Sequence, residues 1–441
     1  MAEKMKPSGI DWIGDVPENW YMIKLKYFSY LKGRIGWQGL TADEFIDEGP
    51  YLITGTDFEN GRIQFDRSYH ISDERYNQAP EIQLKVGDLL VTKDGTVGKM
   101  AYVDTLPGKA SLNSHLLLIR PLENKFDNRF LFWLMSSSVF NGYTEYAQDG
   151  TVMSSLSQEK IGNFIAYFPE ITEQQAVADF LDKECAQIDS IAADLEKQIA
   201  LLQQYKKSLI TETVTKGLDK SVPMKYSGVE WIGEIPNTWD CKKTKYVISE
   251  PLQYGANEAG DDYKEDYPRY IRITDITEEN SLKDDGKLSL SPDIAKPYLL
   301  KDGDLLFARS GATVGKTFYY TSNYGTCAFA GYLIKARFNQ DKMNPKFVYY
   351  TTLGIGYENW KNTVFTQATI QNIGADKYAQ LYITVPSMKE QNEIIAYLDT
   401  QCKAIDDVIH SKYQQLSTIQ QHKKSLIYEY VTGKKRVKEV Q

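Results

Sequence analysis

The sequence predicts two similar domains of the mixed α/β (α+β) class, each followed by one long helix, with the two helices packed antiparallel. Three observations support this: an ordered set of motifs occurs twice, short apolar runs precede a helical stretch in each copy, and each copy ends in a heptad stripe. With 441 residues, the chain has room for two to four domains. The predicted parts are a first domain at 1–171, a helical spacer at 172–221, a second domain at 222–386 and a C-terminal helical spacer at 387–441.

Internal repetition is the strongest signal in the chain. The matching motifs keep the same order at a nearly constant offset, and each copy is about 220 residues long, too long for a solenoid repeat. The chain is therefore expected to be a duplicated unit of domain plus helix. The paired segments are Ser8–Trp20 and Ser227–Trp239, Gly87–Leu90 and Gly303–Leu306, Val97–Lys99 and Val314–Lys316, Glu173-Gln174 and Glu390-Gln391, and Lys206–Ile210 and Lys423–Ile427.

Short apolar runs bounded by Gly, Pro and Asn predict strands in each domain, and a stretch with helical spacing follows them. The charged stretches 37–80 and 254–297 match each other poorly, so we interpret them as variable loops on a shared scaffold. The predicted strands are Val86–Thr92, Lys99–Asp104 and Ser114–Arg120, then Gly303–Arg309, Lys316–Tyr320 and Gly331–Phe338; the predicted helices are Phe126–Phe140 and Pro345–Asn359.

Apolar residues recur every seven positions in both spacers, which is typical of a helix packed along another helix. Phe180, Ile191, Ile199 and Tyr205 widen the first stripe, whereas Lys412 interrupts the second. Lys412 either fixes the register of the helices or reaches past its neighbours, and we favour the second reading. The predicted seam consists of Leu181, Ile188, Leu195, Leu202 and Leu209 in the first spacer and Leu398, Ile405, Leu416, Ile419 and Leu426 in the second.

The short connection between the first spacer and the second domain predicts the direction of the helices. A helix of about 45 residues is roughly 65 Å long. Only the segment Gly217–Tyr226 separates it from the next opening motif, which is too short to run back along a parallel pair. Antiparallel helices need no such return. They predict a dumbbell with pseudo-two-fold symmetry.

No catalytic constellation is evident. Ser310–Thr317 resembles a phosphate-binding loop, but three residues separate its glycines where that loop needs four, and the equivalent Gly95–Met100 has two. We interpret both as β-turns with Lys99 and Lys316 exposed. Pro292-Asp293 is not followed by the Asp/Glu-x-Lys of a nuclease, and the chain has no Pro-Pro for an amino-methyltransferase loop. Because the four His and four Cys are also scattered, we predict no catalytic, cofactor-binding or metal site.

The chain also lacks the signals of membrane insertion and secretion. No apolar run reaches the roughly 18–20 residues that span a bilayer, and the first residues carry no apolar signal segment. The four cysteines form no Cys-x-x-Cys pair, which fits a reducing compartment. We therefore expect a cytoplasmic protein.

The duplicated plan resembles the specificity subunit of type I restriction-modification enzymes. The resemblance rests on the opening motifs Ser8–Trp20 and Ser227–Trp239, the repeated Gly-Asp-Leu-Leu, and long helices with Glu-Gln near their starts and Lys-Lys-Ser-Leu-Ile near their ends. It covers essentially the whole chain. In that family each globular domain is a target-recognition domain that reads one half of a split DNA sequence, and the antiparallel helices space the two domains.

The resemblance also implies partners. These are double-stranded DNA with a bipartite target, two methyltransferase (modification) subunits docked on the helices, and restriction (motor-nuclease) subunits. S-adenosylmethionine, ATP and Mg²⁺ would belong to those partner subunits. This chain would be a non-catalytic part of a site-specific DNA methyltransferase and ATP-dependent endonuclease. A two-headed scaffold for protein partners is the alternative, which the acidic charge and the 31 tyrosines would suit.

The charge of the chain must be reconciled with DNA binding. The net charge is −8, from 51 basic and 59 acidic residues, so we expect weak binding by this chain alone and phosphate contacts from the partner subunits. Base contacts would then come from a few basic residues, since Arg reaching a guanine edge is the commonest specific contact. Each of them can also be an ordinary surface charge, and the stretches 37–80 and 254–297 are equally good places for readers. We interpret Lys434–Lys438 as a frayed tail. The candidate DNA-binding residues are Lys32, Arg34, Lys93 and Lys99 in the first domain and Arg269, Arg272, Arg309 and Lys316 in the second.

Overall fold

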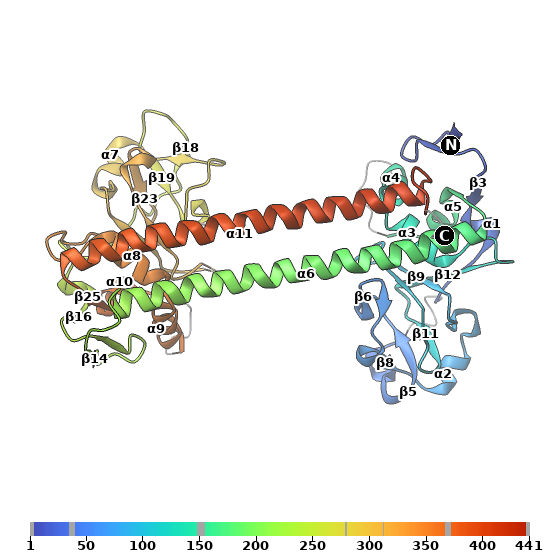
Figure 1. The fold of residues 1–441 in the computed structure, drawn as a ribbon, viewed down its shortest axis with the longest axis horizontal. Coiled ribbons are helices and arrows are strands. Elements are labelled where there is room, and N and C mark those ends of the chain that lie inside the picture. Colours follow the sequence, from blue (N-terminus) through green and yellow to red (C-terminus); the bar gives the residue numbers. More distant parts are fainter. Residues whose placement is uncertain are drawn as a thin grey trace. The chain divides into compact units, whose positions relative to one another are not determined.

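The computed structural model describes residues 4–34, 40–147, 155–277, 280–311, 313–366 and 372–437. It divides into two units, one of residues 1–195 with 414–441 and one of residues 196–413. Each unit holds a mixed globular part and facing segments of the two long helices, α6 (Ile171–Lys216) and α11 (Met388–Val431) (Figure 1).

The first unit is centred on a four-stranded antiparallel sheet in the order β10-β9-β12-β4. A second sheet, β11-β5-β8, contains the parallel pair β11 and β5. Trp20 of the opening motif is 1% exposed and lies in the core with the helices that follow the sheet. The elements of this unit, besides the long helices, are β1 (Met5–Pro7), β2 (Asp15–Pro17), β3 (Tyr21–Lys24), α1 (Leu25–Phe28), β4 (Ser29–Gly33), β5 (Ile46–Ile53), β6 (Phe58–Glu59), β7 (Arg62–Ile63), β8 (Tyr69–His70), α2 (Asp73–Asn77), β9 (Leu89–Thr92), β10 (Met100–Tyr102), β11 (Ala110–Leu112), β12 (Leu116–Pro121), α3 (Asn128–Met135), α4 (Ser138–Tyr146), α5 (Gln158–Asn163) and β13 (Ile165–Phe168).

The second unit repeats this plan. Its antiparallel sheet has the order β17-β24-β21-β22, and its second sheet, β18-β20-β19-β23, again contains one parallel pair. Trp239 takes the core position of Trp20. The elements are β14 (Met224–Tyr226), β15 (Glu234–Pro236), β16 (Asp240–Lys243), β17 (Gln253–Tyr254), β18 (Asp261–Asp262), β19 (Arg269–Ile271), β20 (Leu288–Ser289), α7 (Pro292–Ala295), β21 (Leu305–Ala308), β22 (Thr317–Tyr319), β23 (Cys327–Phe329), β24 (Leu333–Ala336), α8 (Pro345–Leu353), α9 (Ile355–Thr366), α10 (Ala375–Gln380) and β25 (Tyr382–Val385).

Each long helix has a buried glutamine in its first turn, and the two glutamines make equivalent hydrogen bonds. The Gln174 side chain accepts a hydrogen bond from the backbone N–H of Asp127 at 2.8 Å and donates one to the carbonyl of Pro169 at 2.8 Å. Gln391 repeats both bonds, with Asn344 and with the proline before its own helix. The repeated Glu-Gln motif therefore fixes each helix to the globular part from which it emerges.

A bidentate ion pair holds the central sheet of each unit. Asp88, in the repeated Gly-Asp-Leu-Leu motif, accepts hydrogen bonds from Arg120 at 2.7 and 2.8 Å. Asp304 accepts from Arg337 at 2.7 and 2.6 Å. Both aspartates are almost fully buried, and such paired geometry is what makes a buried carboxylate tolerable.

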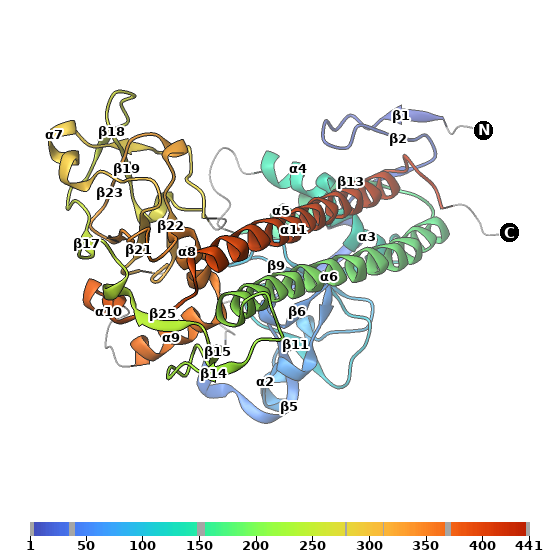
Figure 2. The ribbon, with the colours of Figure 1, turned by 60° about the vertical axis from the view of Figure 1, so that its left-hand side comes forward.

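In the first unit, the facing segments of α6 and α11 run antiparallel. Phe180 contacts Tyr430, with ring centroids 4.4 Å apart, whereas Asp189, further along α6, pairs with Lys423 at 2.6 Å. The partner number falls as the α6 number rises. Figures 1 and 2 both show the two helices side by side.

The second unit shows the same direction. Gln198 accepts a hydrogen bond from Lys412 at 2.5 Å, and Lys206 pairs with Asp406 at 2.6 Å. Lys412 therefore extends past its neighbours to an exposed hydrogen bond with the other helix. The predicted fold class, duplicated mixed domains with two long antiparallel helices, is confirmed.

The stretches interpreted as variable loops are folded. Residues 37–80 contribute β5 to β8, and 254–297 contribute β18 to β20, and apolar side chains of these stretches share buried clusters with the central sheets. The same device follows the inner strand in both: the side chain of Asp57 accepts from Thr54 N–H at 2.7 Å, and that of Asp275 accepts from Arg272 N–H at 2.7 Å. The local structure is thus repeated where the sequence is not.

The predicted strands are present, with only β12 running one residue beyond its expected range, but each predicted helix is two helices. Phe126–Phe140 contains α3 and the start of α4, because Ser137 caps a new helix through the N–H of Val139. Pro345–Asn359 breaks at Gly354, between α8 and α9. Helical periodicity alone does not reveal such breaks.

The C-terminal segment is anchored, so its interpretation as a frayed tail is wrong for the described residues. Lys435 pairs with Glu429 at 2.8 Å, and Arg436 pairs with Glu173 at 3.2 Å. Lys438 lies outside the described residues. Gly433, with φ of 72°, lies so close to the Trp20 ring that an added Cβ would come within 2.9 Å of it.

Candidate functional site

One turn is built in the same way in both units. In the first, the turn after β9 begins with Lys93, whose N–H donates to the carbonyl of His115 at 2.9 Å and whose carbonyl accepts from Leu156 at 2.8 Å. At the far end of the turn, exposed Lys99 donates its ammonium to the carbonyl of Gly55 at 3.2 Å. The main chain of the turn is therefore held from both sides, while the Lys93 side chain is only half-buried.

The second unit places Arg309 where the first has Lys93. Its N–H donates to the carbonyl of Tyr332 at 3.0 Å, and its carbonyl accepts from Ile373 at 2.8 Å. These bonds reproduce those of the first turn, with a different side chain at each of the three bonded residues. The two turns therefore share the same main-chain hydrogen bonds but present different side chains.

The guanidinium of Arg309 is positioned by an aromatic ring. It lies 4.8 Å from the ring centroid of Tyr254, whose hydroxyl accepts a hydrogen bond from Ala375 N–H at 3.0 Å. Such stacking restricts Arg without using its donors. The Nε of Arg309 is buried and has no hydrogen-bond partner among the described residues. Arg309 is thus held in place with hydrogen-bonding capacity unused.

Helix α9 packs against the second turn. The hydroxyl of Tyr357 in α9 donates to the carbonyl of Gly315 at 2.8 Å, and Lys361 packs so closely that a Cβ at Gly315 would lie 2.2 Å from its Cδ. Burial lowers the pKa of Lys361. Lys316, expected to be exposed, is half-buried in this turn.

Both glycine turns connect strands. β9 and β10 pair antiparallel across the first turn, and β21 and β22 pair antiparallel across the second. A phosphate-binding loop of the Walker type instead leads from a strand into a helix, whose N-terminus faces the phosphate. The β-turn interpretation therefore fits the structure.

Two of the predicted DNA-binding residues are buried. Arg34 is 3% exposed and donates from Nε to the carbonyl of Leu112 at 2.8 Å and from Nη2 to Ser111 at 3.1 Å. Arg269 is 9% exposed and donates to the carbonyl of Lys283. Their engagement inside the fold does not fit a role in reading bases.

The remaining predicted DNA-binding residues differ in how far contacts within the protein already engage their side chains. Arg272 is the residue before a short helical turn and clasps Asp275 at 2.7 Å and the carbonyl of Gly286 at 2.8 Å. Lys32 is exposed beside the Tyr30 ring, at 5.9 Å. Lys93 and Arg309 are therefore the best-placed pair: they occupy equivalent positions, whereas Lys99, in the other equivalent pair, donates to the carbonyl of Gly55.

Sequence reasoning missed the neighbours of these two residues. His115 and Tyr332 stand at the starts of equivalent predicted strands, so an alignment of the two copies could have found them. Tyr254 is far from Arg309 in sequence, and only the pairing of β17 with β24 brings it near. His115 also lies 3.3 Å from the Asp94 carboxylate.

The ten predicted seam residues all lie away from solvent. Five are buried and five are half-buried. By contrast, Ile191 and Tyr205, expected to widen the stripe, are 51% and 57% exposed. The buried seam residues are Leu181, Leu195, Leu398, Ile405 and Leu426, and the half-buried ones are Ile188, Leu202, Leu209, Leu416 and Ile419.

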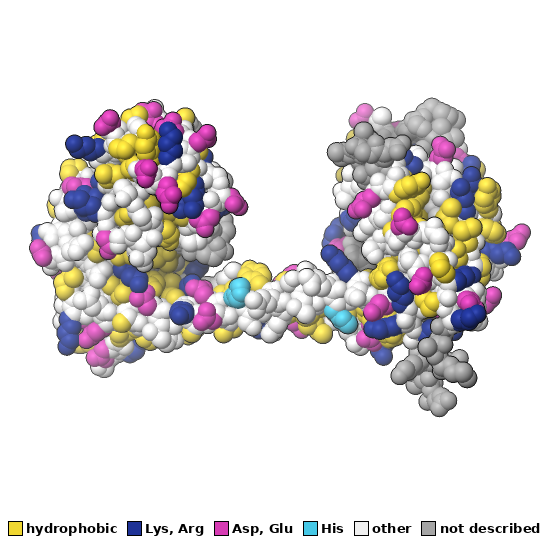
Figure 3. Space-filling model, turned by 90° about the horizontal axis from the view of Figure 1, so that it is seen from above, with side chains coloured by type: hydrophobic (Ala, Val, Ile, Leu, Met, Phe, Trp, Pro, Cys, Tyr) yellow, Lys and Arg dark blue, Asp and Glu magenta, His cyan; other side chains and the backbone are white. Residues whose placement is uncertain are grey.

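Charged side chains of both signs are interspersed on the face of the units that Figure 3 shows. This agrees with the balance of the sequence, in which residues 1–171 carry 17 basic and 23 acidic side chains, and residues 222–387 carry 19 and 20. Among the described residues, no three His, Cys, Asp or Glu side chains are arranged to hold a metal ion. Of the helices described, none is both long and apolar enough to cross a membrane.

Comparisons with known proteins agree with this architecture. The family model for the type I restriction modification DNA specificity domain matches residues 17–201 and 256–418. The chain is 25% identical over 437 residues to the putative type I restriction enzyme MjaX specificity subunit of Methanocaldococcus jannaschii, covering 97% of this chain and 96% of that one. It is 22% identical over 433 residues to the MjaVIII specificity subunit of the same organism, covering 96% and 94%.

A solved structure from work on the assembly and conformational transition of the type I R-M system has the same fold. It is 15% identical, with a TM-score of 0.69, and the match covers 95% of this chain and 99% of that one. The matched family regions together span well over half of the sequence. The chain therefore belongs to the type I restriction-modification DNA specificity family, as a specificity subunit.

Proposed function

We propose that each half of this specificity subunit reads one half of a bipartite DNA target. The observation that carries the proposal is the duplicated turn, which has the same main-chain hydrogen bonds in both units but Lys93 in one and Arg309 in the other. A constant frame with exchanged side chains is what two readers of different sequences require. Arg and Lys both bind the O6 and N7 acceptors of guanine in the major groove.

The two long helices would set the distance between the half-sites. α6 has 46 residues, so as one helix it is about 69 Å long. Equivalent ion pairs, Asp189 with Lys423 and Lys206 with Asp406, tie it to α11 in the two units. A paired helix is stiffer than a flexible linker, which supports a fixed spacing.

The outer faces of the helices would bind two methyltransferase subunits, and restriction subunits would join that core. Support comes from large apolar side chains that the helix pair leaves exposed. S-adenosylmethionine, ATP and Mg²⁺ would be bound by those partners. The exposed residues are Ile191, Leu201 and Tyr205 of α6 and Tyr397, Val408 and Tyr413 of α11.

The acidic net charge of the chain supports different roles in DNA binding for this chain and for its partners. Phosphate neutralisation supplies much of the affinity of DNA-binding proteins, and the net charge of −8 provides little of it. The specificity subunit would therefore supply base contacts, and its partners much of the grip on the backbone.

The test is to map the methylated motif in cells that carry Lys93→Ala or Arg309→Ala in the assembled complex. Each substitution should relax or abolish recognition in one half of the motif, and the two should affect opposite halves. Each lost bidentate contact should cost about 1–3 kcal/mol of discrimination. Lys389→Ala, at an exposed position early in α11, is the control. Loss of both half-motifs from one substitution would contradict the proposal.

A further inference from the structure

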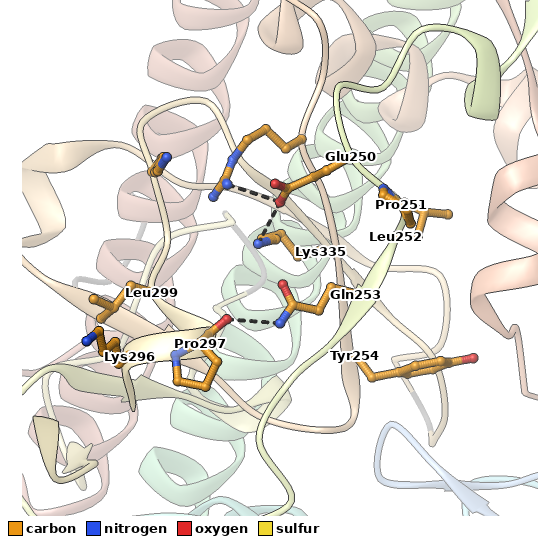
Figure 4. A pocket seen from close by; sticks show the side chains of 11 residues that line it. Glu250, Pro251, Leu252, Gln253, Tyr254, Lys296, Pro297, Leu299 and Lys335 are labelled. Carbon is orange, nitrogen blue, oxygen red and sulfur yellow. Dashed lines mark hydrogen bonds and ion pairs between the residues drawn. The ribbon is translucent and has the colours of Figure 1, made fainter. Parts of the chain in front are cut away.

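A cleft of about 710 Å³ opens on the second unit between β17, the end of β24 and the segment before β21 (Figure 4). Four cationic side chains line it, with one carboxylate among the lining residues. Its walls also include short apolar stretches. The cations are Lys296, Lys301, Lys335 and Arg337, and the carboxylate is that of Glu250.

Glu250 holds two of the four cations at the floor of the cleft. It lies 2.9 Å from Lys335 and 3.0 Å from Arg337. Burial by itself would raise the pKa of Glu250, but these cations and nearby Lys301 outweigh it and lower the pKa. The carboxylate is therefore ionised at neutral pH, and the lining keeps a net positive charge.

The other two cations are uncommitted. Lys296 and Lys301 are exposed, and neither forms an ion pair with a described residue. Both belong to the segment that borders the cleft opposite β17, where Gln253 donates to the carbonyl of Pro297 at 2.9 Å. An anion entering the cleft would thus meet the unpaired ammonium groups of Lys296 and Lys301, above a floor whose two cations are paired with Glu250 and Asp304.

A local insertion creates this cleft, and the first unit lacks the insertion. In the first unit, β4 continues through Leu31, between the residues opposite Arg120 and Leu118. In the second, Glu250–Leu252 stand between Ser249, which bonds to Arg337, and Gln253, which faces Lys335. Three residues thus separate these pairing positions in the second unit, where Leu31 alone separates them in the first.

The residue at the floor changes with the insertion. Leu118 is 0% exposed in an apolar core, whereas Lys335, at the equivalent position of β24, is 3% exposed and charged. Burying a lysine in place of a leucine costs stability unless its charge is used. In the second unit, this buried lysine lines the cleft.

One residue, Tyr254, links the cleft to the Arg309 turn. Tyr254 lines the cleft, and the ring of the same residue carries the Arg309 guanidinium at 4.8 Å. A ligand bound in the cleft would therefore lie beside the group that we propose to contact a base.

We propose that this cleft binds a phosphodiester group of the DNA backbone next to the bases read from the Arg309 turn, and that the first unit has no equivalent contact. The inference rests on the proposed function, since it assumes that the second unit faces DNA. It makes the contacts of this chain with the two half-sites unequal: the second unit would contact bases and a phosphate, and the first unit would lack this phosphate contact.

The test compares Lys301→Ala with its matched control, Lys85→Ala, in the full chain assembled with its methyltransferase subunits. The two lysines are equivalent, because Lys85 N–H donates to Asp88 and Lys301 N–H donates to Asp304. Affinity is measured against salt concentration, on the methylated motif and on a scrambled duplex. Lys301→Ala should weaken binding to both duplexes equally and reduce the slope of log K against log salt by about 0.9.

The double variant Lys296→Ala/Lys301→Ala should reduce that slope by about 1.8, and Lys85→Ala should leave it unchanged. An unchanged slope in the double variant, with tight DNA binding intact, overturns the phosphate assignment while sparing the proposed function. No binding of the motif by the wild-type complex would instead refute the proposed function. Calorimetry with inorganic phosphate distinguishes a site for DNA phosphate from a site for free phosphate. If the wild type binds inorganic phosphate saturably and the double variant does not, while the salt slope for DNA is unchanged, the cleft is a site for free phosphate. That result also overturns the assignment.

Discussion

At the scale of single residues, the repeat shows which side chains build the frame. Gln174 and Gln391 were visible in the sequence only as part of a repeated motif. Their role depends on the backbone N–H of Asp127 and Asn344, which lie 47 residues earlier. Sequence reasoning could mark these residues as equivalent, but it could not find partners that only tertiary folding brings near.

Gln174→Ala should destabilise the first unit by about 1–3 kcal/mol. The substitution leaves the N–H of Asp127 and the carbonyl of Pro169 without partners in a buried place. The measurement is urea unfolding followed by circular dichroism. Gln175→Ala, at the exposed neighbouring position, is the matched control and should change stability by less than about 0.5 kcal/mol. Equal effects of the two substitutions would exclude the anchor role.

Glu390 makes stability depend on pH at the start of α11. Burial would raise its pKa, but hydrogen bonds from Ser387 and from the indole of Trp239 outweigh it and lower the pKa below the ordinary 4.5. Because the folded-state pKa is depressed, the stabilisation is complete above pH 4.5 and is lost as the pH falls through the lower value.

In urea titrations between pH 3 and pH 7, wild type should therefore exceed Glu390→Gln by a constant margin at the upper end. That margin should shrink as the solution is acidified. The single Gln carbonyl can still accept from Ser387, which bonds to Oε2 of Glu390, so the variant should fold. A margin that stays constant down to pH 3 would show that the carboxylate is not stabilised by these donors.

At the scale of elements, the long helices could be predicted from their strong periodicity, whereas the short, irregularly paired strands could not be predicted. The heptad stripe located both long helices, and its seam residues all lie away from solvent. The strands of 37–80 and 254–297 were missed because most have only two or three residues, too few for an alternating pattern to emerge. The burial of Arg34 and Arg269 was missed for a related reason, since Arg34 directly follows β4 and Arg269 begins the three-residue strand β19.

Leu195→Asp should destabilise the helix pair by roughly 2–5 kcal/mol, because it removes a buried leucine and places a carboxyl group in the seam. Leu201→Asp is the control. Leu201 is 54% exposed, so this change should leave the unfolding midpoint within experimental error. Thermal unfolding of the full chain distinguishes the two. Equal destabilisation by both would contradict the assigned seam.

Leu201→Asp has a second expected effect. It places a charge on the exposed apolar surface proposed to bind the methyltransferase subunits, so those subunits should co-purify with this variant less well than with wild type. Full recovery of the complex would remove Leu201 from that surface.

At the scale of the whole molecule, we propose separate readers with a fixed spacer. Lengthening both long helices by one matched heptad adds about 10.5 Å of helix, close to three base pairs at 3.4 Å each. Both half-motifs should be kept and the unread gap between them should widen. Methylation mapping in cells that carry the lengthened subunit gives the gap directly, and an unchanged gap would contradict the spacer role.

The most direct measurement is a domain exchange read out by methylation mapping. Residues about 20–170 are replaced by the corresponding region of a relative that recognises a different target, and the methylated motif is determined in cells with the same partner subunits. We predict that one half of the motif changes to that of the relative while the other half and the gap stay as they were. A change in both halves, or in neither, would contradict the claim that the duplicated domains read the DNA independently.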